Sequence, residues 1–446
     1  MFKSIKIDSP MATLFFNAQI LTMTQTTPSL FNGAVGVVDS RIALVSSSEA
    51  EISLFEEQHP TAQKIDCGGK VLMPGLINTH THVAMTLQRG TGDDTELMPW
   101  LNNIVWPFEA IQSDEDIEAG ARLGIAEMLL GGTTTFVDMY WSEHIIAYAV
   151  EQMGIRAFLG ESCLEGERME IFEKNLPQLI ERASKCERIT PMIAPHAPYT
   201  CSAELFKRCV ELSNKHQLSL MTHLAETRSE VETINERYQM TPTEYLDNCG
   251  MITDKTILAH SIYLTQEDMQ RVKAKGAHIA HNPQCNMKIA SGVAPIAEML
   301  QKEISCSLGT DGVCSNNDLD MWDEMRTASF LQKLTTGDPT AMPAYQVLQM
   351  ATVNGAKAIG REGDLGIISE GALADIIIID TFKIHHRPQH DLISSLVYCG
   401  KASDVDKVMV SGELLVDNST LLNCNIEAIC SDVEQRSRQI FDKMKQ

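Results

Sequence analysis

Seven potential metal-binding side chains stand where apolar runs of the sequence end. His80 and His82 follow the run 71–78. In a β-strand, residues at i and i+2 project from the same face, so these two imidazoles can form half of a metal site. The other five end later apolar runs: His196, His223, His260, His281 and Asp311.

A single buried histidine is most simply explained as a hydrogen-bonded core residue. Candidate ligands at the ends of six separate runs favour metal binding instead. Imidazoles with one carboxylate and no thiolate suit Zn²⁺, with Fe²⁺ or Mn²⁺ as alternative occupants. Such an ion would lower the pKa of a water molecule to about 7 and so supply hydroxide at neutral pH. The simplest ligand set is His80, His82, His223 and Asp311.

Apolar runs alternate with helical segments through the middle of the chain. The helical segments include 114–130, 203–216 and 230–246. This alternation is typical of parallel βα units, and eight of them predict a (β/α)8 barrel, which belongs to the α/β class. The active site of such a barrel lies at the carboxyl ends of its strands, where the candidate ligands stand. The eight predicted strands are 72–80, 133–139, 156–162, 190–196, 219–226, 256–261, 278–282 and 306–311.

The segments before and after the predicted barrel contain short strand-like runs separated by turn residues. Neither 12–71 nor 364–424 is large enough to hold a core alone. We therefore expect both to pack together as one discontinuous β-sandwich beside a catalytic barrel over 72–363. Residues 425–446 are predicted to form an amphipathic C-terminal helix. Between the first two barrel strands, a long loop is expected over the barrel mouth.

Charge and composition exclude several classes of protein. The net charge of −23 and the pI of 4.9 argue against partners such as nucleic acid or an anionic membrane surface. No apolar run approaches the roughly 18 residues of a transmembrane helix, and the N-terminus lacks the features of a signal peptide. Twelve cysteines without C-x-x-C pairs indicate reduced thiols. We therefore expect a cytoplasmic protein; whether it forms a homo-oligomer is left open.

Several sequence segments resemble the amidohydrolase superfamily. They are PGLINTHTH at 74–82, HLAE at 223–226, ILAH at 257–260 and LGTDG at 308–312. MPWLNNIVWPFEA at 98–110 and APHAPYTCS at 194–202 narrow the likeness to its methylthioadenosine/S-adenosylhomocysteine deaminases, in the triazine-hydrolase-like branch. The likeness covers nearly the whole chain. It implies a zinc-dependent hydrolase that deaminates methylthioadenosine, S-adenosylhomocysteine or adenosine to the inosine analogue and ammonia.

The resemblance also implies a role for each residue of the metal site and its surroundings. It assigns one zinc ion to the ligand set chosen above. Glu226 would shuttle protons to a ring nitrogen and then to the leaving ammonia; alternatively it is a carboxylate that satisfies a helix N-terminus. His260 would polarise the attacking water or stabilise the oxygen on the tetrahedral carbon. Asp311 would serve as ligand and as acceptor of the water's proton, and both carboxylates would contact the substrate.

The remaining substrate contacts follow from the same resemblance. Glu109 would bind the ribose diol, unless it is a surface glutamate on a helix. His196 would contact the base or the ribose. Arg168 would bind a homocysteine carboxylate. Trp100, Trp106 and Phe108 would wall the thioether end of the pocket.

The segment after the third predicted strand departs from the family pattern. Relatives that accept the amino-acid tail tend to have a second arginine there, whereas this chain has Glu161. A carboxylate at that point would repel the tail, which favours methylthioadenosine or adenosine over S-adenosylhomocysteine. His281 is expected to orient a neighbour, and the pair His385–His386 is left without a role.

Three rival functions remain. The same scaffold could act on a triazine, guanine, a pterin or another amino-heterocycle. A binuclear amidase would carry a lysine at the end of the fourth strand, where this chain has His196. A non-catalytic nucleoside-binding metal protein would not need Glu226 and His260 beside Asp311. The sequence contains neither a G-x-G-x-x-G motif nor a Walker loop, so it does not predict a nucleotide cofactor.

Overall fold

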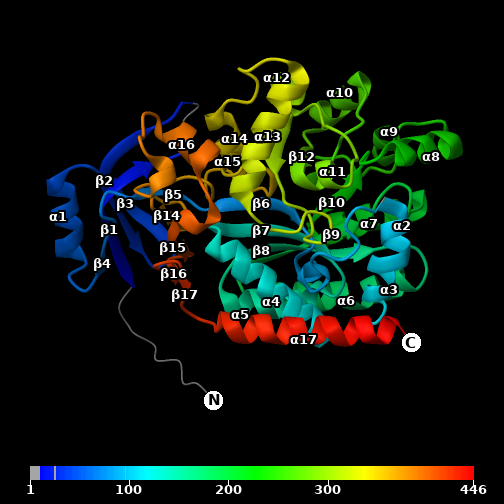
Figure 1. Ribbon diagram of the computed structural model, residues 1–446, viewed down its shortest axis with the longest axis horizontal. Helices are drawn as coiled ribbons and strands as arrows, with labels where there is room; N and C mark the ends of the chain where they lie inside the picture. The colour runs from blue at the N-terminus through cyan, green and yellow to red at the C-terminus, as the bar shows by residue number, and fades with distance from the viewer. Residues whose placement is uncertain (1–10, 25–26, 96, 446) are drawn as a thin grey trace.

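An eight-stranded parallel barrel forms the centre of the computed structural model, which describes residues 11–24, 27–95 and 97–445 (Figure 1). Each predicted strand overlaps one barrel strand, so the predicted barrel is confirmed. The last strand returns to the first where the Thr79 hydroxyl donates to the Leu308 carbonyl at 2.8 Å. The barrel strands are β6 Leu76–Thr81, β7 Thr133–Tyr140, β8 Arg156–Cys163, β9 Ile189–Pro195, β10 Ser219–Leu224, β11 Thr256–His260, β12 His278–His281 and β13 Ser305–Leu308.

Both flanks join in one sheet beside the barrel, at the left of Figure 1. Its hydrogen-bonded order is β17-β16-β15-β14-β5-β1-β2-β3, with β4 also paired to β1. The expectation that both flanks join in one β-structure beside the barrel is therefore confirmed. Its strands are β1 Ala12–Leu21, β2 Leu30–Val38, β3 Arg41–Ser46, β4 Gln63–Asp66, β5 Val71–Pro74, β14 Ile376–Ile379, β15 Val405–Val410, β16 Glu413–Asp417 and β17 Thr420–Leu421.

This flank sheet curls around its own apolar core. The Ile42 N–H donates to the Ala372 carbonyl at 2.9 Å, which brings β3 to the segment that leads into β14. Phe15, Ile376 and Met409 are among the side chains buried inside the curl. The flank domain thus has an apolar core of its own.

The predicted first strand, 72–80, is two strands in different sheets. β5 pairs with β1 and β14 of the flank sheet, and the barrel begins with β6 after Gly75. Every residue of both strands is buried. The apolar run therefore continues across the break, because each strand is covered on both faces.

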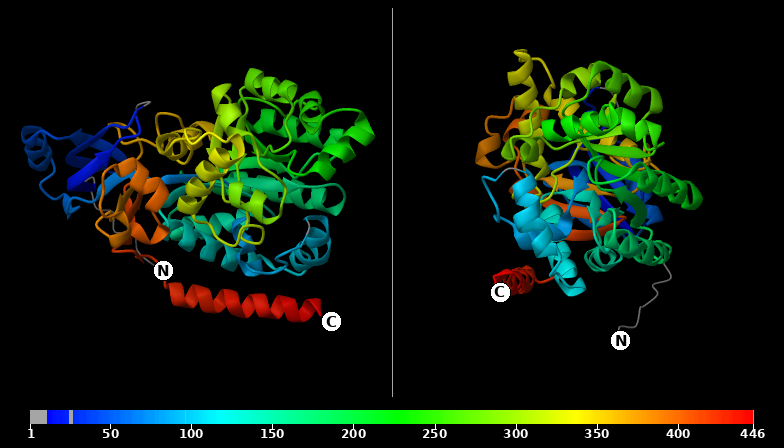
Figure 2. Two further views of the ribbon diagram at one scale, coloured as in Figure 1. Left: turned by 45° about the horizontal axis from the view of Figure 1, so that its top comes forward. Right: turned by 90° about the vertical axis from the view of Figure 1, so that its right-hand side faces the viewer.

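Helices surround the barrel and follow most of its strands (Figures 1 and 2). Among the described helices, none is both long and apolar enough to cross a membrane. The α-helices are α1 Glu49–Gln58, α2 Leu97–Trp100, α3 Trp106–Glu109, α4 Asp114–Leu130, α5 Glu143–Met153, α6 Glu167–Ala183, α7 Ala203–His216, α8 Arg228–Tyr238, α9 Pro242–Asn248, α10 Gln266–Lys275, α11 Pro283–Lys288, α12 Ile296–Gln301, α13 Met321–Thr336, α14 Ala344–Met350, α15 Val353–Ala358, α16 Leu392–Cys399 and α17 Ile426–Met444.

One predicted helix, 230–246, is two helices. Gln239 takes a left-handed conformation (φ 56°) and ends α8. The Thr241 hydroxyl then accepts a hydrogen bond from the Glu244 N–H, and Pro242 opens α9. Such a cap followed by proline is a start signal for a new helix.

The expected loop over the barrel mouth is a chain of short helical turns. The 3₁₀ turn η1 (Val83–Gln88), α2, the π-helical turn η2 (Leu101–Val105) and α3 follow one another. We call this segment, residues 83–109, the mouth segment. Two further 3₁₀ turns, η3 (Ile384–His386) and η4 (Ala402–Asp404), lie in the second flank. The predicted C-terminal helix is α17, which runs along the outside of the barrel (Figure 2).

Candidate metal centre and active site

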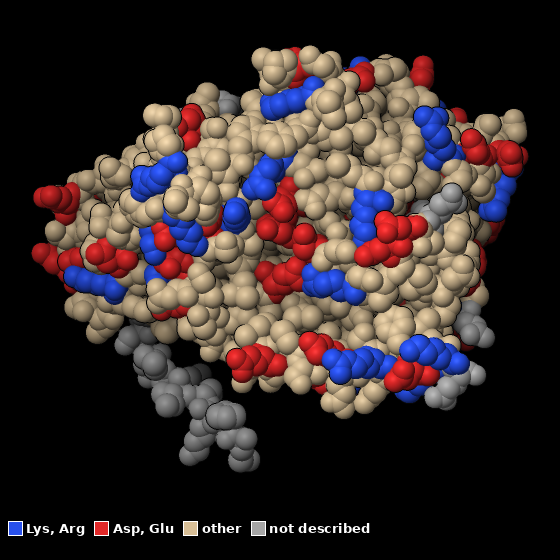
Figure 3. Space-filling view, in the orientation of Figure 1, with Lys and Arg blue, Asp and Glu red and all other residues tan. Residues whose placement is uncertain are grey.

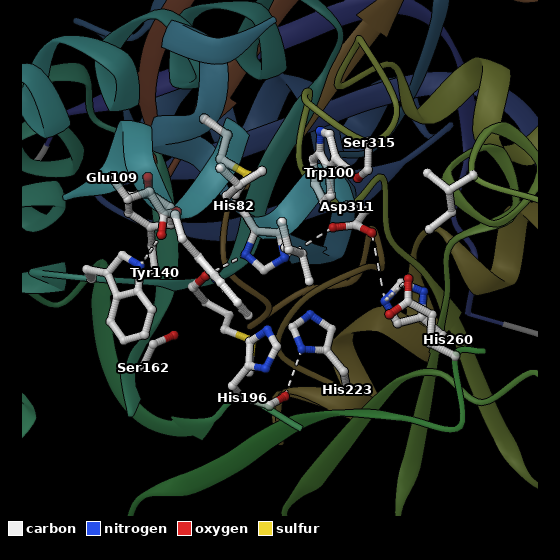
Figure 4. Close-up of a pocket in the computed structure, with 18 of the residues that line it drawn as sticks. His82, Trp100, Glu109, Tyr140, Ser162, His196, His223, His260, Asp311 and Ser315 are labelled. Carbon is white, nitrogen blue, oxygen red and sulfur yellow. Dashed lines mark hydrogen bonds and ion pairs between the residues drawn. The ribbon is translucent and has the colours of Figure 1, made fainter. Parts of the chain in front are cut away.

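The predicted metal ligands meet at the carboxyl ends of the barrel strands. His80 and His223 are the next-to-last residues of β6 and β10, and Asp311 follows β13. One ligand atom from each of His80, His82 and His223 lies within 4.8 Å of the others, and the same holds for His80, His260 and Asp311. Figure 4 shows His82, His223 and Asp311 directed into one pocket.

His80 shows that this cluster fits a cation. Its side chain is fully buried, and neither ring nitrogen has a hydrogen-bond partner. Burial lowers its pKa well below the usual value, so the ring is neutral and offers a lone pair. Its Nε2 lies 3.5 Å from an Asp311 oxygen, and the Nε2 of His82 lies 3.2 Å from the same oxygen. Three imidazoles and one carboxylate are a donor set for a divalent metal ion.

In His82 and His223, the ring nitrogen that faces away from the cluster bonds a backbone carbonyl oxygen. The Nδ1 of His82 lies 2.5 Å from the Met139 carbonyl, and the Nδ1 of His223 lies 2.7 Å from the His196 carbonyl. A carbonyl oxygen only accepts, so each Nδ1 carries a proton, and each ring turns its Nε2 toward the centre of the cluster. This arrangement is the usual orientation of metal-binding histidines.

Asp311 is held in an unusual backbone conformation beside His80. It has φ 64°, and its N–H donates to the His80 carbonyl at 2.9 Å. A Cβ on Gly309 would lie 2.8 Å from the Cβ of His80, so only glycine allows this approach. Burial would raise the pKa of Asp311, but the hydrogen bond from His82 and the nearby imidazoles outweigh burial and hold it well below its usual range.

Glu226 and His260 lie next to the metal ligands. His260 Nε2 is 3.8 Å from a Glu226 oxygen and 3.8 Å from the second oxygen of Asp311. Its Nδ1 bonds the Asn286 side-chain oxygen at 2.9 Å, which orients the ring. Burial raises the pKa of Glu226, and His260 offsets part of that rise. The group can therefore hold a proton nearer to neutral pH than an exposed glutamate.

Glu230 is a site residue that the sequence reading missed. Its two carboxylate oxygens accept hydrogen bonds from the backbone N–H groups of Ala225 and Glu226, each at 2.9 Å. Burial raises its pKa to about 8. The stretch Thr227-x-x-Glu230 has the spacing of a capping box, but that motif would pair Glu230 with the N–H of Thr227 and so does not predict the observed contacts.

The end of the pocket that lies away from His260 and Glu226 is formed by the mouth segment and β7. Glu109 lines it with only 8% of its surface exposed, so the alternative of a surface glutamate is wrong. Its carboxylate accepts a hydrogen bond from the Trp141 indole at 2.9 Å, and burial raises its pKa. Glu109 and His260 face each other across the pocket in Figure 4.

Of the three aromatic residues that were predicted to wall the pocket, two line it and one does not. Trp100 and Trp106 line the pocket. Phe108 does not: it is fully buried on the other side of α3, 5.0 Å between ring centroids from Phe441. Residues three apart share one face of an α-helix, so Trp106 and Glu109 lie together toward the pocket while Phe108 lies on another face.

His196 and Arg168 have different relations to the pocket. His196 lines it, 4.9 Å between ring centroids from His223, and burial lowers its pKa to about 3. The Arg168 guanidinium stacks on Trp141, 4.2 Å from the ring centroid, and Arg168 is not among the lining residues. An indole therefore separates the predicted tail-binding arginine from the pocket.

Glu161 lies outside the pocket. Ser162 lines it, and because neighbouring residues on a strand alternate, Glu161 faces the helix layer. Its carboxylate accepts hydrogen bonds from the N–H groups of Ser142 (3.1 Å) and Glu143 (2.8 Å) and from Asn175 (3.2 Å). The interpretation that Glu161 repels a substrate carboxylate is therefore wrong.

The other histidines do not extend the site. His281 is buried without a hydrogen-bond partner for either ring nitrogen, and burial lowers its pKa to about 3. His385 and His386 both bond Asp404, at 2.8 and 3.0 Å. The Lys383 ammonium lies 3.3 Å from the other oxygen of Asp404, so that cluster already holds a positive charge.

Comparisons with known proteins agree with this geometry. The 5-methylthioadenosine/S-adenosylhomocysteine deaminase of Halothermothrix orenii is 40% identical over 433 residues, which are 96% of this chain and 100% of that protein. The 5'-deoxyadenosine deaminase of Methanosphaera stadtmanae is 40% identical over 429 residues, 94% of this chain and 100% of that protein. A zinc-bound adenosine deaminase structure from Xanthomonas campestris is 30% identical with a TM-score of 0.91, covering 98% of this chain and 99% of that one.

A family model also matches most of the chain. It describes the amidohydrolase family and covers residues 71–415. That range begins with β5, contains the whole barrel and extends into β16 of the flank sheet. By its sequence, its barrel and the residues at the barrel mouth, the chain belongs to the amidohydrolase family.

Proposed function

We propose that this chain is a metal-dependent hydrolytic deaminase that converts a 6-aminopurine nucleoside into its inosine analogue and ammonia. The observation that carries the proposal is the position of His260 Nε2, 3.8 Å from both Glu226 and Asp311. Side chains that can exchange protons next to a metal site are needed for hydrolysis of a substrate. A protein that only binds a nucleoside does not need them. Two relatives at 40% identity are named as deaminases of nucleosides of this class.

Zinc is the proposed metal, held by His80, His82, His223 and Asp311. The zinc in the related adenosine deaminase structure supports this choice. When bound, the ion would lower the pKa of a water molecule to about 7 and so supply hydroxide at neutral pH. The neutral ring of His80 and the ionised Asp311 suit this role.

Proton transfer in the reaction falls to three side chains. A C6–O bond forms and the C6–N bond breaks, so a water proton must reach the departing ammonia. Glu226, whose burial raises its pKa, donates a proton to a ring nitrogen and then assists the amine to leave. Asp311 accepts the remaining proton of the attacking water, and this proton then passes to the departing ammonia. His260 stabilises the oxygen that forms on C6.

The far end of the pocket would bind the sugar. One carboxylate oxygen of Glu109 accepts from Trp141, which leaves acceptor capacity for the two vicinal hydroxyls of a ribose. His196, neutral at physiological pH, lies between the sugar end and the metal ligands, where it can contact the ribose or the base.

The pocket favours a substrate with an apolar 5′ substituent. None of the described residues that line it is a lysine or an arginine. Arg168 stands behind the Trp141 ring, where it can meet only a long tail that passes the indole. A carboxylate that leaves water for a pocket without a cationic partner costs binding free energy. Methylthioadenosine and 5′-deoxyadenosine are therefore the preferred substrates, ahead of S-adenosylhomocysteine.

A substrate panel tests the proposal. Ammonia release is measured for adenosine, methylthioadenosine, 5′-deoxyadenosine and S-adenosylhomocysteine, with guanine, a pterin and an aminotriazine as rivals. Turnover confined to the last three compounds would replace the nucleoside with another amino-heterocycle, and no turnover with retained nucleoside binding would indicate a non-catalytic protein.

Matched variants test the role of Glu226. Glu226→Gln should lower kcat at least about 100-fold, because the lost proton transfer is worth that much, while zinc content stays unchanged. Glu232→Gln is the control, since Glu232 is exposed on the neighbouring helix α8. Equal kcat values for the two variants would remove Glu226 from the mechanism.

A further inference from the structure

The C-terminal helix packs directly beneath the mouth segment. α17 contacts α4, η1 and α3, although all three lie far earlier in the sequence (Figure 1). We propose that α17 is a positioning element for the sugar end of the pocket, acting through Phe108 on Glu109. This inference depends on the proposed role of Glu109 in binding the ribose.

An apolar cluster joins α17 to the mouth segment. Phe441 of α17 meets Phe108 of α3 with ring centroids 5.0 Å apart. Val433 and Ile440 are buried in the same cluster, together with Leu87 of η1. Burial of such apolar side chains is favourable, so the cluster holds α3 and η1 against α17.

Two polar contacts fix the position of α17 along the barrel. The Ser437 hydroxyl donates to the Leu87 carbonyl at 2.7 Å. Arg436 forms an ion pair with Asp116 of α4 at 2.9 Å. The first of these contacts binds η1, whose Met85 lines the pocket, so α17 supports both ends of the mouth segment.

The short helix α3 transmits this support to the pocket. It has four residues, and a helix of this length has no stability of its own in water. Trp106 and Glu109 line the pocket, while Phe108 points to α17. Loss of the Phe108–Phe441 contact would therefore let Glu109 move relative to the metal ligands.

The outer face of α17 takes no part in this packing. Charged side chains lie along it at the lower edge of Figure 3. Arg438, for example, is 77% exposed and pairs only with Glu434 of the same helix among the described residues. This residue supplies a control that changes α17 without touching the mouth segment.

Phe441→Ala tests the proposal against Arg438→Ala. We expect KM for methylthioadenosine to rise about tenfold in Phe441→Ala, as for one lost hydrogen bond, with kcat within about twofold and zinc content unchanged. Arg438→Ala should match the wild type. 2′,3′-Dideoxyadenosine lacks the diol, so its KM should not respond to Phe441→Ala. An equal rise for both nucleosides would overturn the proposal.

A double variant and hydrogen exchange complete the test. Phe441→Ala should add nothing to the KM of Glu109→Gln, and Phe441→Leu should restore most of the loss because it refills the cluster. Amides of η1 and α3 should exchange faster in Phe441→Ala than in Arg438→Ala. Unchanged exchange would overturn the inference even if the protein deaminates no nucleoside, whereas absent turnover with faster exchange would contradict only the proposed function.

Discussion

Single residues of the site work through partners that the sequence does not display. The side chains that meet at the barrel mouth could be predicted, because His80, His82 and the later candidates stand at the ends of apolar runs. Glu230 could not be assigned, since its contact depends on the left-handed turn at Ala225 (φ 47°), which brings two N–H groups toward one carboxylate. Glu161 was misread for a related reason: the side to which a strand residue points follows from its register, which Ser162 reveals.

His80→Ala should abolish metal binding. The ring is buried and both nitrogens lack protein partners, so its removal takes away a ligand without freeing another group. Zinc content measured by atomic emission should fall far below one equivalent, and turnover should be lost. His216→Ala is the control because His216 is exposed at the end of α7. Full zinc content in His80→Ala would contradict the ligand assignment.

Glu230→Gln should impair catalysis without affecting the metal. An amide offers one acceptor where the carboxylate offers two, so the N–H of Ala225 or Glu226 loses its partner. We expect kcat to fall roughly tenfold or more, as for a hydrogen bond of about 1–2 kcal/mol, with KM and zinc content near wild-type values. Steady-state kinetics against Glu236→Gln, an exposed residue of α8, provides the comparison. Unchanged kcat would show that Glu226 needs no such support.

At the scale of elements, periodicity predicts the barrel but not its breaks. α4 and α7 have the predicted bounds, because polar residues frame a clear helical pattern. The run 72–80 hides two strands, because continuous burial leaves no polar mark at Gly75. The break in 230–246 was visible in Thr241-Pro242, a cap and a first-turn proline within an otherwise helical stretch.

Glu161 connects β8 to the start of α5 and should make stability depend on pH. Burial raises its pKa from 4.5 to about 8, so the folded state keeps a proton that the unfolded chain releases. The contribution of Glu161 to the free energy of unfolding is fully present below pH 4.5 and is lost as the pH rises toward 8. Glu161→Gln cannot ionise, so the wild-type Tm should fall relative to this variant across that window.

Thermal melts between pH 5 and 9 test this prediction. Glu173→Gln is the matched control, because Glu173 is an exposed residue of α6 with 54% of its side chain accessible. Its melting curve should follow the wild type at every pH. Parallel curves for the wild type and Glu161→Gln would mean that Glu161 keeps an ordinary pKa in the folded protein.

The whole molecule is held together by contacts between distant parts of the chain. The flanks form a domain of their own, and α17 supports the mouth segment from outside the barrel. A family resemblance can predict that both flanks meet, but it does not say which contacts fasten them to the barrel. Those contacts join residues more than 200 positions apart, and pairing at such distances leaves no local pattern in the sequence.

Arg156 makes the clearest of these contacts between the barrel and the flank domain. At the start of β8, its guanidinium pairs with Asp375 at 3.0 and 3.1 Å, and both side chains are 3% exposed. Arg156→Ala would leave a buried carboxylate without its cation and should cost about 3–5 kcal/mol, or about 3–5 °C in Tm for a chain of this size. Lys64→Ala is the control, because the Lys64–Glu56 pair is exposed (51% and 37%) and its loss should cost less than about 1 kcal/mol. Equal Tm values for the two variants would mean that the Arg156–Asp375 pair does not hold the flank domain to the barrel.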